Sequence, residues 1–308
     1  MSNPEIKLVT NSDIDRVKWD RCIADSANGI AYAYSWYLDR ICDKWDALIW
    51  GDYQYVMPLV NNTKYGISYI YQPFFTQQLG VFSNLSVEPA IVEQFLNAIP
   101  KQFRLTDMNL NLGNTFLSEH FNAKQNTTYH LNLHPEISEI RAAYNSNTRR
   151  NIQKSIQNKV TISQISDASL FLEFARTNLK EKSPEIKSRH YSALQEVVNY
   201  ALKKKLGEIY VARNTENKML ASVFFARTNQ TSIYLAASSN HEGIEKSAMF
   251  LLIDTFIQNS AKNNLILDFE GSNISGIARF YAGFGGLPKT YISVHQNHLP
   301  KLLRILKK

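Results

Sequence analysis

The sequence predicts an α/β fold built from two units of similar element order in tandem. The second half reads as helices, a three-strand meander, a helix, a strand, a helix and a last strand. The first half repeats that order more faintly. With 308 residues and 44% hydrophobic side chains, the chain is long enough for one large domain or two ordinary ones.

The elements of the second half follow from the spacing of apolar residues. A helical stripe at Ile137, Ile140 and Tyr144 resumes at Ile152 and Ile156, after a polar cluster that predicts a break. The later predicted helices are 168–181, 189–205, 246–262 and 274–284, and the predicted strands are 208–213, 219–226, 232–237, 265–270 and 291–295.

The first half is predicted in the same way, and the boundary between the halves is placed near His134-Pro135. This gives domains 1–134 and 135–308, the second ending in a short basic amphipathic helix over 298–308. The predicted helices are 12–23, 34–43 and 87–98, and the predicted strands are 47–50, 53–58, 67–72, 104–110 and 127–133.

The most informative segment is the strand and helix from Leu265 to Gly286. Apolar and polar residues alternate up to Asp268 and Glu270, so period two predicts that both carboxylates project to one side of the strand. Gly271 ends the strand before a helix that carries Tyr281. Two acidic residues at the end of a strand, followed by a glycine turn and a helix, indicate a functional site.

Two segments resemble the Fem family of peptidyltransferases, which belong to the GNAT acyltransferase superfamily. Asp268-Phe269-Glu270-Gly271, followed by Phe284-Gly285, is similar to the acidic strand end and the phenylalanine-glycine helix end of that family. The run Ser146-Asn147-Thr148-Arg149-Arg150-Asn151-Ile152-Gln153-Lys154 is similar to its basic helix, which leads to a strand starting near Val160. The resemblance implies two tandem GNAT-like domains.

The resemblance also implies bacterial N-acyl or aminoacyl transfer to the amine of a cell-wall or envelope precursor. Peptidoglycan precursors are the implied acceptor and aminoacyl-tRNA is the implied donor. The chain lacks the long helical hairpin that some members insert for tRNA, so acyl-CoA-dependent transfer to a small amine or sugar stays open. A non-catalytic binder of an anionic envelope precursor or nucleic acid is the alternative from another class.

Acyl transfer to an amine needs a base for the ammonium and a donor to the developing oxyanion. Glu270 is the candidate base, Asp268 its neighbour or orienter, and Tyr281 the candidate donor to the oxyanion or leaving group. The structural alternatives are an ion pair of Glu270 with Arg279, an Asp268 carboxylate that accepts backbone N–H groups, and a core role for Tyr281.

GNAT folds hold the donor pyrophosphate at the loop that precedes a helix, here residues 237–248. Asn240-x-x-Gly243-x-Glu245 keeps one glycine of the acetyl-CoA signature but has a carboxylate where a small residue belongs, which argues against ordinary CoA binding. Basic residues of the Fem-like helix are candidates to contact the phosphates of a longer anionic chain. The predicted donor-binding residues are Ser239, Asn240, Gly243, Lys246, Arg149 and Arg150.

An amide-rich and aromatic segment over 69–78 is the candidate acceptor site, in a groove between the two domains. Its structural alternative is a strand-to-loop passage whose glutamines are satisfied by neighbouring groups. The predicted acceptor-binding residues are Tyr71, Gln72, Gln77 and Gln78.

The net charge of +7 is distributed unevenly, with 10 Lys+Arg against 13 Asp+Glu in residues 1–134 and 24 against 14 in the remainder. Such a field favours an anionic partner: a phosphate-bearing donor, nucleic acid or a membrane surface contacted peripherally.

No apolar run is long enough to span a bilayer and no signal peptide is recognisable, which predicts a cytoplasmic protein. Cys22 and Cys42 have no CxxC spacing, which predicts free thiols rather than a metal site. We expect no metal and no tightly bound cofactor, only the acyl donor as a substrate.

Overall fold

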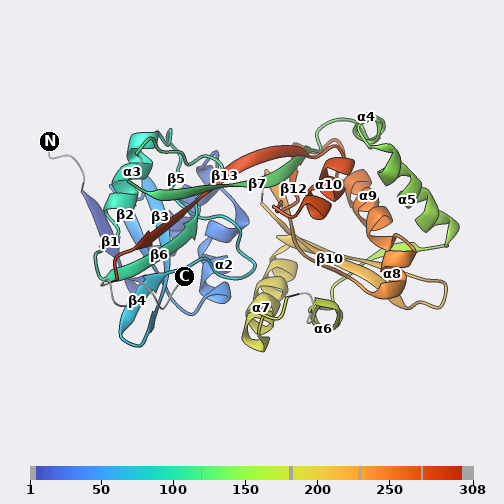
Figure 1. The fold of residues 1–308 in the computed structure, drawn as a ribbon, viewed down its shortest axis with the longest axis horizontal. Coiled ribbons are helices and arrows are strands. Elements are labelled where there is room, and N and C mark those ends of the chain that lie inside the picture. The colour runs from blue at the N-terminus through green and yellow to red at the C-terminus, as the bar shows by residue number, and fades with distance from the viewer. Residues whose placement is uncertain (1–4, 119, 180–182, 229, 272, 300–308) are drawn as a thin grey trace. The chain divides into compact units, whose positions relative to one another are not determined.

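The computed structural model describes residues 5–118, 120–179, 183–228, 230–271 and 273–299. The predicted C-terminal helix over 298–308 falls almost entirely outside the described residues. The chain packs into two compact units: unit 1 comprises residues 1–126 and 290–308, and unit 2 comprises residues 127–289 (Figure 1).

Unit 1 is a mixed sheet with strand order β1-β2-β3-β4-β6-β13. Neighbouring strands run antiparallel except β4 and β6, which are parallel and are joined through a helix, as parallel strands require. Short strand β5 also pairs with β3. The strands are β1 (Ile6–Val9), β2 (Trp45–Trp50), β3 (Tyr55–Lys64), β4 (Ile67–Ile70), β5 (Phe82–Ser83), β6 (Phe103–Asn109) and the last residues of β13 (Leu287–Asn297).

The helices of unit 1 begin where the sequence supplies a cap. The Asp15 carboxylate accepts the N–H groups of Val17 and Lys18 at the start of α1, and Pro89 occupies the first turn of α3. The helices are α1 (Arg16–Asp25), α2 (Ser35–Ile41) and α3 (Pro89–Asn97), with 3₁₀ turns η1 (Asn11–Asp13) and η2 (Ala31–Ala33).

Unit 2 has the strand order β8-β9-β10-β11-β12-β7, again antiparallel except for one parallel pair, β11 and β12. Helices α6 and α7 cover one face of this sheet and α9 and α10 lie on the other (Figure 1). The strands are β7 (Asn122–Asn132), β8 (Thr161–Ile165), β9 (Gly207–Arg213), β10 (Met219–Arg227), β11 (Thr231–Ser239) and β12 (Ile266–Asp268). The helices are α4 (Ile137–Ala142), α5 (Ser146–Gln157), α6 (Ala168–Leu179), α7 (Ser188–Lys204), α8 (His241–Glu245), α9 (Ala248–Ser260) and α10 (Ser275–Gly283).

The strands of each unit therefore follow the same plan: four antiparallel strands, a parallel neighbour reached through a helix, and a final antiparallel strand. In each unit, the final strand is the one that would be expected, from its position in the sequence, to end the other unit. β7 follows β6 in sequence but pairs with β12, whereas β13 follows β12 and its last residues pair with β6. This exchange is why packing divides the chain at 126/127 and 289/290, whereas the sequence places one boundary at 134/135.

Several element boundaries differ from the prediction. Strand β1 is absent from the prediction, and the strand predicted over 67–72 ends at Ile70. The helix predicted over 246–262 is α9 (Ala248–Ser260), which begins after Ser247 because that residue has a left-handed conformation with φ 56°. The short helix α8, in the loop before it, is absent from the prediction. Strand β8 begins just after Val160, where the resemblance implies a strand.

Each unit has its own apolar core. The core of unit 1 includes Phe95, Phe103 and Met108, and that of unit 2 includes Phe225 and Phe256, whose rings stack at 3.7 Å. Within the described ranges no helix is long and apolar enough to cross a membrane. Cys22 and Cys42 are free thiols.

Candidate active site

The candidate site is built on the turn between β12 and α10, which are consecutive elements of unit 2 (Figure 1). β12 ends at Asp268, and Glu270 has a left-handed backbone with φ 54°. The period-two argument for placing both carboxylates on one side therefore does not extend to Glu270. Gly271 is required by close approach: a Cβ there would lie 2.1 Å from Thr128 Cα and 2.2 Å from the Thr127 carbonyl oxygen.

Asp268 is the buried anchor of this turn. Its Oδ1 accepts the Thr128 hydroxyl at 2.6 Å and the Glu270 backbone N–H at 2.9 Å. The bond from Glu270 is the one that the structural alternative for Asp268 predicts. The other carboxylate oxygen, Oδ2, lies 3.3 Å from His130 Nε2, an ion-pair contact whenever that imidazole is protonated.

Thr128 and His130 come from β7 and are missing from the sequence prediction. β7 and β12 are antiparallel neighbours with Asp268 opposite His130, a pairing across more than a hundred residues that no local pattern reveals. The available signal was weak: Thr128 and His130 are two apart in the predicted strand 127–133 and so share a face.

Glu270 places a carboxyl group in an environment that disfavours its charge. The residue as a whole is partly exposed, but its Oε1 is buried, and burial raises the pKa of the Glu270 carboxyl well above its usual value. The alternative ion pair with Arg279 is not formed. The Arg279 guanidinium instead donates from Nε to the Ser275 carbonyl at 3.3 Å and makes no ion pair with any described residue.

Tyr281 lies against the same turn from α10. Its ring stacks on Phe269 with centroids 4.9 Å apart and meets the Tyr234 ring edge-on at 5.9 Å. Burial raises the pKa of the Tyr281 hydroxyl, and the nearby charges of Glu270 and Asp268 raise it further. The hydroxyl therefore keeps its proton at neutral pH and can serve as a hydrogen-bond donor. The structure thus brings together Asp268, Glu270 and Tyr281.

The predicted donor loop is the passage from β11 to α9. Asn240 caps α8, with Oδ1 accepting the Gly243 N–H at 2.7 Å, while its backbone carbonyl accepts the Ile244 N–H at 3.0 Å. Lys246 donates to Glu242 Oε1 at 2.8 Å. These groups are already engaged within the loop, and Ser239 ends β11 just before it. A pyrophosphate would have to displace these bonds.

The two predicted arginines of α5 have different surroundings. Arg149 donates from Nε to the Tyr144 carbonyl at 2.9 Å and from Nη2 to the Ala142 carbonyl at 2.8 Å, so it caps the end of α4. Arg150 is exposed, and it has no ion pair with the described residues. Only Arg150 is therefore fully available to an external anion.

The predicted acceptor residues lie in unit 1, where their amides tie the 69–78 segment to the end of β6. Gln72 donates to the Thr76 carbonyl and accepts the Asn109 N–H, and buried Gln78 accepts the Leu112 N–H at 3.1 Å. The Gln77 side chain accepts from Gln78 at 2.8 Å. The Tyr71 ring lies 5.8 Å from that of Tyr69. The satisfied glutamines are what the structural alternative predicts, and acceptor binding stays a prediction.

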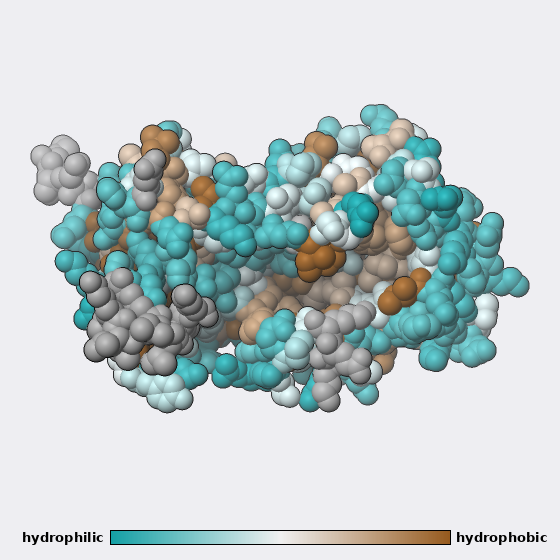
Figure 2. All heavy atoms as spheres, in the orientation of Figure 1, coloured by the Kyte–Doolittle hydropathy of each residue, from teal (hydrophilic) through white to brown (hydrophobic). Residues whose placement is uncertain are grey.

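Apolar surface gathers in a hollow of unit 2 near β10 and α10 (Figure 2). Exposed isoleucines of this unit include Ile244 in α8, at 59% exposure, and Ile274 immediately before α10, at 63%.

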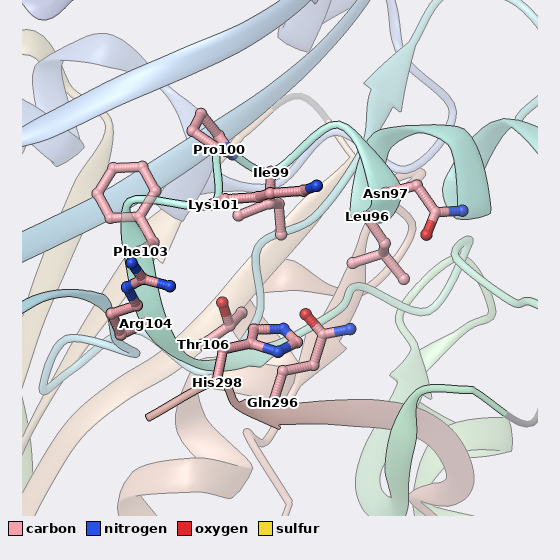
Figure 3. Close-up of a pocket in the computed structure, with 10 residues that line it drawn as sticks. All are labelled: Leu96, Asn97, Ile99, Pro100, Lys101, Phe103, Arg104, Thr106, Gln296 and His298. Atoms are coloured by element: carbon pink, nitrogen blue, oxygen red, sulfur yellow. The ribbon is translucent and has the colours of Figure 1, made fainter. Parts of the chain in front are cut away.

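Unit 1 contains a separate hollow of about 300 Å³ beside the end of α3 (Figure 3). Its floor includes buried Leu96, Phe103 and Thr106, and Lys101 and Arg104 extend from its rim. No cluster of three metal-ligating side chains is present among the described residues.

No family model and no curated protein matches the sequence. Solved structures do match. FemX superposes with a TM-score of 0.67 at 11% identity, covering 96% of this chain and 99% of FemX. The C-terminal domain of a protein assigned as a lysylphosphatidylglycerol synthetase from Agrobacterium fabrum superposes with a TM-score of 0.56 at 11% identity. The match covers 95% of this chain and 94% of that domain. L-PGS from Bacillus licheniformis superposes with a TM-score of 0.50 at 10% identity, and the match covers 85% of this chain and 87% of L-PGS. In fold, the chain is similar to FemX, with two GNAT-like domains in tandem.

Proposed function

We propose that the protein is an acyltransferase that transfers an aminoacyl or acyl group to the amine of an envelope precursor. The observation that carries the proposal is the carboxyl of Glu270, which is held with a raised pKa beside Asp268 and Tyr281 on a GNAT-like strand end. The Fem-like fold supports the reaction class, and FemX and the lysylphosphatidylglycerol synthetases support an envelope acceptor.

The chemistry assigns one role to each group. An amine acceptor arrives mainly as an ammonium and must lose a proton before its nitrogen attacks the acyl carbonyl. Ionised Glu270 accepts that proton, and the neutral amine then forms the N–C bond. The acyl–oxygen bond of the donor ester breaks, and the second proton of the attacking nitrogen passes to the leaving oxygen. Tyr281 keeps its proton and donates a hydrogen bond to the developing oxyanion or to the leaving oxygen. Asp268 is a positioning residue, because it accepts the N–H of Glu270 and so holds the turn.

We favour aminoacyl-tRNA over acyl-CoA as the donor. In the β11–α8 loop, Asn240 already satisfies two backbone N–H groups, and Glu242 and Glu245 place negative charge where a pyrophosphate would bind. The basic helix α5 offers exposed Arg150 and Lys154 to the phosphates of a longer chain. Acyl-CoA is the alternative donor.

Calorimetric titration at low salt distinguishes the donors, because phosphate contacts are strongest there. We expect saturable binding of aminoacyl-tRNA and no heat with acetyl-CoA. Micromolar binding of acetyl-CoA would contradict the tRNA donor and support acyl-CoA-dependent transfer. Binding of tRNA without any transfer to envelope amines would instead support the non-catalytic binder.

A further inference from the structure

A polar pocket of unit 2 lies beside helices α4, α5 and α9, which Figure 1 shows as a group of neighbouring helices. It encloses about 340 Å³, the size of a small-ligand site. Neither Glu270 nor Tyr281 contributes to its lining. The lining residues are Arg141, Tyr144, Arg149, Ile152, Gln153, Ile156 and Asp254.

Two guanidinium groups at this pocket are held in fixed positions by the protein. Arg141 donates to Asp254 from Nε at 2.9 Å and from Nη2 at 2.7 Å, and it also contacts Gln258 at 2.8 Å. Arg149 is fixed by the Tyr144 and Ala142 carbonyls. Within the described residues, the Nη1 group of neither arginine makes a hydrogen bond. Rigid guanidiniums lose little entropy when they bind an oxyanion.

Tyr144 supplies the independent observation. Its side chain is only 4% exposed and its ring is fixed edge-on against Phe284, with centroids 5.3 Å apart. Its hydroxyl is buried, and among the described residues it has no hydrogen-bond partner. The Asp254 carboxylate acts on this hydroxyl through its charge and as a weak side-chain hydrogen-bond partner, but the two groups fall outside the distance and angle of an ordinary hydrogen bond. A buried hydroxyl that makes no hydrogen bond lowers the stability of the fold, unless a bound ligand accepts its hydrogen bond.

We propose that this pocket binds a small oxyanion, a phosphate monoester or a carboxylate, which accepts hydrogen bonds from the Tyr144 hydroxyl and the outer N–H groups of Arg141 and Arg149. The lining carries two cations and one anion, so one positive charge remains for the ligand. Ile152 and Ile156 on one face of α5 provide an apolar wall for the group that bears the anion. The site does not depend on the transfer chemistry proposed above.

The hollow beside α3 lacks these features. Its cations, Lys101 and Arg104, are exposed on the rim (Figure 3). Among its described lining residues, no buried side-chain nitrogen or oxygen lacks a hydrogen-bond partner. The pocket of unit 2 is therefore the stronger candidate for a built oxyanion site.

The test is calorimetric titration of the full chain with inorganic phosphate and, separately, with acetate, at ionic strength held constant with sodium chloride. We expect saturable binding of one of the two anions. The anion that binds more tightly shows whether the natural ligand of the pocket carries a phosphate or a carboxylate. Tyr144→Phe should weaken that binding about tenfold, since it removes one hydrogen bond to a charged group. Its folding should be intact because the ring is kept.

Tyr32→Phe is the matched control, because Tyr32 also has a buried hydroxyl that lacks a partner among the described residues but belongs to unit 1. It should leave anion binding unchanged. The proposal is overturned if neither anion saturates, if Tyr144→Phe binds like the wild type, or if Tyr32→Phe weakens binding equally.

Discussion

Glu270 combines two unfavourable features, a left-handed backbone with φ 54° and a buried carboxyl oxygen. A non-glycine residue in this region costs about 1–3 kcal/mol, and burial adds the cost of a disfavoured charge. Asp268 offsets part of the backbone cost by accepting the Glu270 N–H. Such features cluster at functional sites, and this supports a chemical role for the side chain.

The raised pKa of Glu270 predicts a specific dependence of stability on pH. Between the unfolded pKa near 4.5 and its raised folded pKa, the folded protein binds more protons than the unfolded chain. Stability contributed by this group therefore falls as pH rises through that window. Glu270→Gln does not titrate, so its melting temperature should increasingly exceed that of the wild type from pH 4.5 upward.

Glu242 provides a control of opposite sign for these melting experiments. A hydrogen bond from Lys246 is the main cause that lowers the pKa of this partly exposed carboxyl. Its stabilising effect is present above the unfolded pKa and is lost as pH falls through the folded pKa. Glu242→Gln should therefore gain nothing over the wild type at neutral pH. A Glu270→Gln protein that melts with the same pH profile as the wild type would argue against a raised pKa.

At the scale of elements, the site depends on how closely β7 approaches the β12–α10 turn. Gly271 has the backbone of Thr127 and Thr128 directly against it. Gly271→Ala should lower the free energy of unfolding by about 3 kcal/mol, because backbone cannot shift as a flexible side chain does.

The matched substitution is Gly276→Ala in α10, where nothing lies within 4 Å of the new methyl group. It should raise the free energy of unfolding by about 0.5–1 kcal/mol, since alanine favours a helix. Urea unfolding of both variants measures the contrast. Equal stabilities for the two variants would contradict the close approach at residue 271.

Local patterns predicted most elements but not their pairing. The 265–270 alternation identified the strand, and the glycine and the helix after it were also placed correctly. The exchange of β7 and β13 was not predictable, because strand pairing across more than a hundred residues leaves no local pattern. For the same reason the prediction omitted Thr128 and His130. It did name Asp268, Glu270 and Tyr281, which lie at one turn of the structure, and their catalytic roles stay predictions.

At the scale of the whole molecule, the excess of positive charge in residues 135–308 predicts salt-dependent binding of a polyanion. If about three phosphates are contacted, affinity for tRNA should fall roughly 30-fold between 50 and 200 mM salt. The double variant Arg150→Gln, Lys154→Gln should reduce the slope of log affinity against log salt by about 1.5.

Lys203→Gln is the control for this slope. Lys203 is in the last turn of α7, where a cation is stabilised by the helix C-terminus, so its replacement should leave the slope nearly unchanged. Fluorescence anisotropy with labelled tRNA measures all three proteins. Identical slopes for the wild type and the double variant would exclude α5 as the phosphate-binding helix.

The proposed role of Glu270 is tested by a transfer assay with radiolabelled aminoacyl-tRNA and a bacterial envelope-precursor extract, in which the wild type is compared with Glu270→Gln. We predict label transfer by the wild type, and a loss of about 10²- to 10⁴-fold in the variant with donor affinity kept, because only the proton acceptor is removed. Transfer by Glu270→Gln at the wild-type rate would show that this carboxyl does not activate the amine.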